Sequence, residues 1–478
     1  MPLTLVGGTT GAIDFGLRTQ IWPFMWANGR EIKDVSGLNN HQKLQWNVAE
    51  KNLGIYKAMG AKWNIVIVRH KLDASVDWAR LEKIIKKHKQ AGLFVMFRLI
   101  EDPRVYDNLA SDSDPGWGYN QKYYAWVHSL AMRFQADVKY YMIGNEVDHD
   151  LGHNLPKYKK TIVDYSQYAK LVRTARKAIK GVSPDLKVVD CGVSSFTLGL
   201  AVASKLKKED NVFSAYQFWD RFKYDRLSAF GGLPWLVKML GRENIKRRIR
   251  FAKDTYSDCK VFDAIQLHHY FSPDSLPQIM DWIKSNLSAA GCHPEIIATE
   301  IGYRVPFKKG KTWDGRSRNV ADWEKYEPDE HAASLVKDFT ILLENNVKHL
   351  LYWQARFHND RSPTATLFHS DGDVNNFEVW PAGLAYKVFV KKIGNKAYKK
   401  EAILNKRELH EASFSSDVRL VIVWAEDEPV LLNGKDLLGV DAVFGMYGNK
   451  IEFSGKRQIK IGNKPVYLEW PVKPSVAN

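Results

Sequence analysis

The sequence predicts an α/β fold, namely a (β/α)8 TIM barrel with a small C-terminal antiparallel β-sandwich domain. Two observations support this prediction. Apolar strand-like segments alternate with helix-like segments over roughly the first 400 residues, which is typical of parallel strands joined by helical crossovers. From about Ala402 the pattern changes to short runs of alternating polarity with turn residues between them. We therefore expect a catalytic barrel over residues 1–400 and an accessory sandwich over residues 401–478.

The expected barrel strands are continuous apolar runs, as strands buried on both faces require. Helical periodicity lies between them, and the clearest helices are Trp78–Gln90, Tyr123–Phe134, Tyr165–Lys180, Asp329–Asn345 and Pro381–Lys391. The strands are expected within Ala12–Trp22 and at Asn64–Val68, Leu93–Leu99, Tyr140–Asp148, Leu186–Val193, Val261–His269, Glu295–Thr299 and Leu350–Gln354.

The connection after the fifth strand is unusually long. Residues 194–260 are about twice what one helix and two short loops need, so an insertion over the barrel mouth is expected at about 195–260. Its segment AYQFWDRF carries Trp219, which we consider as a sugar-binding residue. The alternative is that these aromatic residues form the small core of the insertion itself.

The charge balance allows two interpretations. The chain has 70 basic and 54 acidic residues, a net charge of +16, which is consistent either with an acidic polysaccharide partner or with a solvated lysine-rich surface. No nucleic-acid-binding module accompanies the basic runs, and no apolar stretch is long enough to span a membrane. The N-terminus lacks signal-peptide features, which predicts a cytoplasmic protein if the chain is complete and a secreted one if a signal has been removed.

No cofactor or metal site is predicted. The three cysteines are widely spaced, and whether any two of them pair is left open. His149 and His153 have the spacing of metal ligands on a helix, but their segment contains Gly and Pro. The HSDGDVNN turn lacks the twelfth-position Glu of a calcium loop, and His268 with His269 lacks a third zinc ligand nearby.

Two glutamates carry the predicted chemistry. Glu146 ends the strand YYMIGNE and Glu300 ends the strand EIIATE, the fourth and seventh strands of the expected barrel. Retaining cleavage of a glycosidic bond needs two carboxyl groups about 5 to 5.5 Å apart, one nucleophilic and one that donates and then removes a proton. We expect Glu146 to be the acid/base, kept protonated by the negative charge of Glu300. The alternative is a pair of buried structural carboxylates.

The neighbouring residues fit this chemistry. Asn145 precedes the acid and is placed to bind a sugar hydroxyl if the strand end bends. Tyr270 and Arg69 are expected to hold Glu300 ionised, and Trp353 to stack against the sugar. For Arg69 and Trp353 a structural role is a comparable alternative, because barrel interiors also use these residues for packing.

Four motifs in order, GNE at Gly144, LHHY at Leu267, TEIGY at Thr299 and LYWQ at Leu351, resemble the glycoside hydrolase clan A barrel. They are most similar to family 39, the β-xylosidase and α-L-iduronidase group, or a related family with a GNE strand. The resemblance covers residues 40–395. It implies retaining hydrolysis with Glu146 as acid/base and Glu300 as nucleophile, and it places Asn145, His268, Tyr270 and Trp353 in the sugar pocket. Val147 stands where many relatives have proline.

The sequence thus predicts a retaining glycoside hydrolase acting on β-linked, or stereochemically equivalent, oligo- or polysaccharides, and the basic residues favour a substrate with acidic groups. The alternative is a non-catalytic carbohydrate-binding barrel. The sugar, its linkage, endo or exo action and the oligomeric state are left open.

Overall fold

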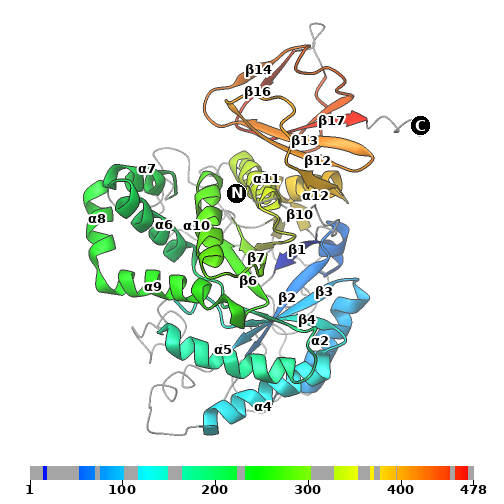
Figure 1. Ribbon diagram of the computed structural model, residues 1–478. Coiled ribbons are helices and arrows are strands. Elements are labelled where there is room, and N and C mark those ends of the chain that lie inside the picture. Colours follow the sequence, from blue (N-terminus) through cyan, green and yellow to red (C-terminus); the bar gives the residue numbers. More distant parts are fainter. Residues whose placement is uncertain are drawn as a thin grey trace, which may run out of the picture.

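The computed structural model describes residues 14–18, 53–69, 76–101, 117–148, 164–222, 232–302, 328–353, 367–370, 377–394, 396–452 and 458–471. Eight parallel strands close into a barrel in sequence order, with the first strand paired to the eighth (Figure 1). The predicted (β/α)8 barrel is confirmed. Its strands are β1 (Asp14–Arg18), β2 (Trp63–Arg69), β3 (Phe94–Ile100), β4 (Val138–Ile143), β5 (Lys187–Val189), β6 (Ala264–His269), β7 (Glu295–Ile301) and β8 (His349–Trp353).

Amphipathic helices cover the outside of the barrel. The predicted bounds hold for α2 (Trp78–Gln90) and α5 (Tyr165–Lys180), and Asp77 and Asp164 satisfy backbone donors where these helices begin. Each large apolar side chain on their inner faces contributes about 1.5–3 kcal/mol by leaving water. The other helices of the ring are α4 (Trp117–Phe134), α9 (Glu243–Ser257), α10 (Leu276–Ala289), α11 (Pro328–Glu344) and α12 (Pro381–Ile393).

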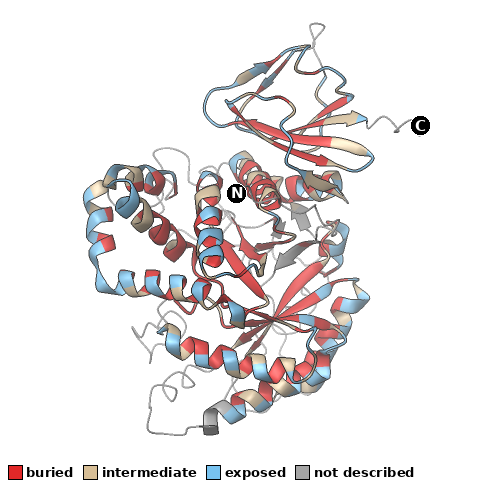
Figure 2. Cartoon of the chain, in the orientation of Figure 1, coloured by how far each residue is buried: buried red, intermediate tan, exposed pale blue. Residues whose placement is uncertain are grey.

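The barrel interior has an apolar lower part and a polar upper part. Trp63, Ile65, Met96 and Met142 belong to an apolar cluster inside the barrel. Because side chains on one face of a strand recur every second residue, Arg98 lies one layer above Met96 on the same face. Figure 2 shows those barrel strands that are not drawn in grey as buried along most of their length. The polar layer therefore begins well below the rim.

The insertion is helical. It comprises α6 (Ser195–Glu209), α7 (Val212–Phe222), α8 (Leu233–Gly241) and α9, of which α9 returns to the barrel wall between α5 and α10. The short helix η7 (Pro273–Ser275), which follows β6 at the C-terminal end of the barrel, contacts α7. In Figure 1 these green helices stand together at one side of the ribbon. Whether they cover the opening stays a prediction.

The proposed sugar-binding role of Trp219 is wrong, because its side chain is 0% exposed. Its ring packs 5.1 Å from Phe222 and 5.8 Å from both Phe196 and Trp235, centroid to centroid. No face of the indole is open to a ligand. The alternative considered above, an aromatic core within the insertion, accounts for this residue.

The C-terminal domain contains a five-stranded antiparallel sheet in the order β11-β12-β13-β17-β15 and a two-stranded sheet, β14-β16, as the alternating pattern predicted. The apolar cluster between them is separate from that of the barrel. Three strands, β11, β12 and β15, were not predicted, and Lys450 forms an isolated bridge where a strand was expected. The strands are β11 (Ala397–Lys399), β12 (Leu409–Ser415), β13 (Val418–Ala425), β14 (Val430–Leu432), β15 (Ala442–Gly445), β16 (Ile459–Ile461) and β17 (Val466–Pro471).

This domain is attached to the barrel through α11 and α12 (Figure 1). His410 of β12 hydrogen-bonds Glu344 at the end of α11, with 2.9 Å between Nε2 and Oε2. Burial lowers the pKa of His410, but hydrogen bonds and charge from Glu344 and Glu426 outweigh it and raise the pKa to about 9. Lys392 of α12 pairs with Glu469 of β17 at 2.8 Å.

Cys259 and Cys292 form a disulfide, which resolves the pairing left open by the sequence. It joins the short helix η6 (Cys259–Val261) to the connection between α10 and β7. Cys191 is buried and unpaired. Among the described residues, no helix is both long and apolar enough to cross a membrane.

Candidate active site

The backbone after β4 bends twice before it delivers Glu146. Gly144 has φ +84°, and a Cβ there would lie 2.8 Å from the side chain of Val147. Glu146 itself has φ +46°, a left-handed conformation that costs a non-glycine residue about 1–3 kcal/mol. Its N–H donates to the carbonyl of Cys191 at 2.9 Å, which holds the bend. Strained backbone of this kind gathers at functional sites.

A register shift in β7 aims Glu300. Leu267 of β6 pairs with Ala298, but the next residue, His268, pairs with Glu300, so one residue of β7 is skipped. Such bulges redirect a side chain beside many active sites. Glu300 is paired with His268 and is only 3% exposed.

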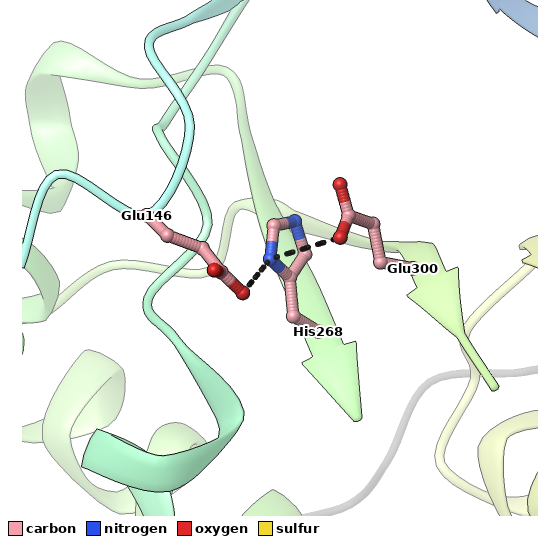
Figure 3. Close-up of side chains that lie close together, drawn as sticks. All are labelled: Glu146, His268 and Glu300. Atoms are coloured by element: carbon pink, nitrogen blue, oxygen red, sulfur yellow. Dashed lines mark hydrogen bonds and ion pairs between the residues drawn. The ribbon is translucent and has the colours of Figure 1, made fainter. Parts of the chain in front are cut away.

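His268 lies between the two glutamates (Figure 3). Its Nδ1 is 2.9 Å from Glu146 Oε1 and 3.8 Å from Glu300 Oε2. The imidazole is completely buried, and its ring packs against the backbone of Gly192, where a Cβ would come within 2.5 Å of Nε2. Gly192 is therefore required for the position of His268, a requirement that the sequence pattern did not indicate.

The two carboxyl groups are close together. One oxygen from each of Glu146 and Glu300, with a nitrogen of His268, forms a set of atoms that all lie within 4.8 Å of one another. Glu146 is partly open, with 22% of its side chain exposed, whereas Glu300 lies deeper. The pair thus offers one buried and one more accessible carboxyl group.

Arg98, rather than Arg69, is the cation that contacts Glu300. Its Nη1 donates to Glu300 Oε1 and to Asn145 Oδ1, and it is completely buried. Arg69 is in register with Ile100, two residues further along the barrel, about 7 Å nearer the rim. Burial lowers the pKa of Arg69, and Glu101 opposes the change. The cation expected beside Glu300 is therefore present as Arg98, and a charge effect of Arg69 on Glu300 stays a prediction.

Behind Arg98 is a second buried layer. Gln266 Oε1 accepts from Arg98 Nη2 at 3.0 Å and from Thr299 Oγ1 at 2.8 Å. Its backbone N–H donates to Asp190 Oδ1 at 2.5 Å. Burial raises the pKa of Asp190 to about 7, although backbone hydrogen bonds and the charge of Arg98 oppose it. The guanidinium of Arg98 is therefore held by Glu300 and Asn145 at Nη1 and by Gln266 at Nη2.

Tyr270 and Trp353 stand beside Glu300. The Tyr270 hydroxyl donates to Glu300 Oε2, as the sequence led us to expect. The rings of Tyr270 and Trp353 meet edge to face, 5.0 Å between centroids, and Trp353 is partly exposed. Asn145, Glu146, His268, Glu300, Tyr270 and Trp353 thus lie in one connected site, and Arg69 and Trp219 do not belong to its described contacts.

The set of Glu146, His268 and Glu300 is also the one described group whose donor atoms are close enough for a metal ion. The surroundings fit a cation poorly. Both oxygens of Glu300 already accept hydrogen bonds, one from Tyr270 and one from the cationic Arg98. A metal ion would have to displace Tyr270 and would be repelled by the fixed guanidinium. His149, His153 and residues 371–376 of the HSDGDVNN turn lie outside the described residues.

The comparisons with known proteins show the fold. No family model matches the chain, and no curated protein is similar to it in sequence. Among solved structures, a family 39 glycoside hydrolase from Bacteroides cellulosilyticus is 12% identical with a TM-score of 0.57, covering 97% of this chain and 81% of its own.

Two other neighbours have the same fold. The catalytic domain of the GH30 xylanase C from Talaromyces cellulolyticus is 12% identical with a TM-score of 0.51, over 97% and 98% of the two chains. A glucosidase from Croceicoccus marinus is 12% identical with a TM-score of 0.50, over 88% and 92%. These proteins are glycoside hydrolases by description, as the clan A resemblance predicted. At this identity the likeness concerns architecture.

Proposed function

We propose that the protein is a retaining glycoside hydrolase with Glu300 as nucleophile and Glu146 as acid/base. The observation that supports this most strongly is that one carboxyl oxygen of Glu146 and one of Glu300 lie within 4.8 Å of each other. Retaining enzymes need about 5–5.5 Å between these groups, whereas inverting enzymes leave about 6.5–9.5 Å for a water molecule.

In the first step, Glu300 attacks the anomeric carbon while Glu146 gives its proton to the departing glycosidic oxygen. A covalent glycosyl ester on Glu300 results, and the sugar or aglycone leaves as an alcohol. In the second step, Glu146 removes a proton from water as the water oxygen attacks the anomeric carbon. The ester bond breaks, and Glu300 and Glu146 regain their starting protonation.

The surrounding residues have separate tasks in this scheme. Arg98 and Tyr270 stabilise the ionised form of Glu300 and fix its orientation. His268 holds the carboxyl group of Glu146. Because Asn145 Oδ1 accepts from Arg98, its amide NH2 is left to donate to a sugar hydroxyl. The partly exposed Trp353 supplies an aromatic face for the sugar.

We propose that the substrate is a β-linked, or stereochemically equivalent, oligo- or polysaccharide with acidic groups. The net charge of +16 supports this, because a basic surface concentrates polyanions near the site. The basic segment after Glu300, with Trp313 and Trp323, lies outside the described residues.

The test is a panel of aryl glycosides and neutral and acidic polysaccharides, with Glu146→Gln and Glu300→Gln as controls. Hydrolysis with retained anomeric configuration, lost in both variants, is expected. Binding of sugars without hydrolysis would support the non-catalytic barrel instead, and inverted product would contradict the nucleophilic role of Glu300.

A further inference from the structure

A buried polar cluster lies directly behind the acid/base loop. Asp148, two residues after Glu146, is completely buried. Its Oδ1 accepts from the backbone N–H of Ser194 at 3.0 Å, and its Oδ2 accepts from the Ser194 hydroxyl at 2.6 Å. Ser194 is the N-cap residue of α6, the first inserted helix. The loop that carries Glu146 is thus tied to the insertion.

The returning helix α9 completes the cluster through Arg248. Its Nε donates to Thr197 Oγ1 at 3.0 Å, and its Nη2 donates to Ser194 Oγ at 3.2 Å and lies 3.7 Å from Asp148 Oδ2. Arg248 is 9% exposed, and its guanidinium stands 5.6 Å from the ring centroid of Phe196. Three segments therefore meet at one buried ion pair.

Three of the inserted helices, α6, α7 and α8, pack together independently of this cluster. Trp219, Phe222, Phe196 and Trp235 already give α6, α7 and α8 an aromatic core. A buried ion pair contributes little to net stability, because removing two charges from water costs several kcal/mol per ion. The pair is, however, well placed to fix one conformation of the loop, in which Glu146 adopts its left-handed backbone.

We propose that the inserted helices act as a brace for the acid/base loop, and that Asp148 and Arg248 are positioning residues for Glu146. The insertion follows β5 and the loop with Glu146 follows β4. The proposed brace therefore joins the connections that follow two neighbouring strands of the barrel. This inference rests on the proposed function, in which Glu146 protonates the leaving oxygen.

The test uses Asp148→Asn, which retains the shape of the side chain but not its charge, and the double variant Asp148→Leu with Arg248→Met, which removes both charges and avoids an unpaired one. Arg247→Met is the matched control, because Arg247 lies on the same helix and pairs with Asp164 at 2.9 Å on the surface. Melting temperatures establish that each variant is folded.

The first measurement compares phenyl and dinitrophenyl β-glycosides of the sugar that the wild-type protein cleaves. Dinitrophenolate leaves without a proton, whereas phenolate needs one from Glu146. In both Asp148 variants we expect kcat/KM for the phenyl glycoside to fall about 10- to 100-fold, and that for the dinitrophenyl glycoside about 2- to 3-fold. An equal fall for both substrates, or no fall, would overturn the proposal.

The second measurement needs no substrate. The nitrogen NMR shifts of the His268 imidazole report its contact with Glu146, so in the Asp148 variants they should move toward those of Glu146→Gln and stay unchanged in Arg247→Met. Unmoved shifts would show that the cluster does not position Glu146. If the wild-type protein cleaves no glycoside, the proposed function is refuted. The His268 shifts would then still show whether Asp148 and Arg248 position Glu146.

Discussion

The two ends of the barrel hold similar residues in different arrangements. Strand β7 carries Glu295 at its first residue and Glu300 near its last. At the N-terminal end, Glu295 binds His349 at 3.0 Å and the hydroxyl of Tyr140 at 3.2 Å. At the C-terminal end, Glu300 has a tyrosine and a nearby histidine too, but also a buried arginine and a second glutamate.

The surroundings of Glu295 and Glu300 differ in the features that a catalytic carboxyl group needs. Glu295 is one-third exposed, with its two partners satisfying its charge, as in an ordinary structural ion pair. Glu300 is 3% exposed and lies within 4.8 Å of Glu146, an arrangement that stability alone would disfavour. A glutamate, a histidine and a tyrosine are therefore insufficient to identify a site. The second carboxyl group and the depth of burial distinguish the two ends.

The largest expected difference is between the activities of the Glu300→Gln and Glu295→Gln variants. Glu300→Gln should reduce turnover by about 10⁴-fold or more, because an amide cannot form the glycosyl ester. Glu295→Gln should leave kcat within about 3-fold of wild type and lower the free energy of unfolding by about 1 kcal/mol. Steady-state rates and denaturant unfolding of both variants check this. Comparable rates would remove the distinction between the two ends.

The two arginines give the next contrast. Arg98→Met should lower kcat about 10²- to 10³-fold, since Glu300 and Asn145 both lose their shared donor. Arg69→Met, one layer higher, should change kcat less than about 5-fold. Rates for the two variants measured at one pH decide the point, and equal losses would restore Arg69 as a partner of Glu300.

The tyrosines allow a smaller comparison. Tyr270→Phe removes a hydrogen bond to Glu300, and we expect kcat to fall about 10- to 30-fold. Tyr140→Phe removes a hydrogen bond to Glu295 and should cost about 0.5–1.5 kcal/mol of stability without altering kcat. If kinetics and unfolding showed the reverse assignment, the functional end would have to be reconsidered.

The smallest effect is on the pH dependence of stability. Burial opposes ionisation of Glu295, but the hydrogen bond and charge of His349 and the hydroxyl of Tyr140 prevail and lower its pKa. A lowered folded pKa stabilises the protein above the usual value of 4.5, and this contribution disappears as the pH falls below it. Wild type should therefore lose up to about 1 kcal/mol more than Glu295→Gln between about pH 6 and pH 3, by calorimetry or denaturant titration.

Much of the architecture and both glutamates were predictable from the sequence, because parallel strands place their C-terminal residues at one rim. The sequence did not separate Arg98 from Arg69. Arg69 ends β2 and Arg98 lies two residues before the end of β3, and only the tertiary contacts show that Arg98 is the guanidinium that reaches Glu300. A charged residue within LFVMFRL was the available signal.

Other features depended on tertiary packing that periodicity does not report. An aromatic residue on an amphipathic helix has the same pattern whether it faces a ligand or a core, which is why the role of Trp219 was misassigned. Gly192 acts through its contact with His268, a residue 76 positions away in the chain, and has no local pattern. β12 (LHEASFS) lacks a clear alternation of polar and apolar residues, and it was missed.

The Cys259–Cys292 disulfide encloses the segment that contributes Gln266, His268 and Tyr270. Such a covalent closure of about 30 residues restricts the unfolded chain and stabilises the folded one by roughly 3–4 kcal/mol. Thiol reductants should therefore destabilise the folded site, although they react with the disulfide and with none of the site residues. The durability of the site is coupled to the redox potential of the medium in which the protein folds.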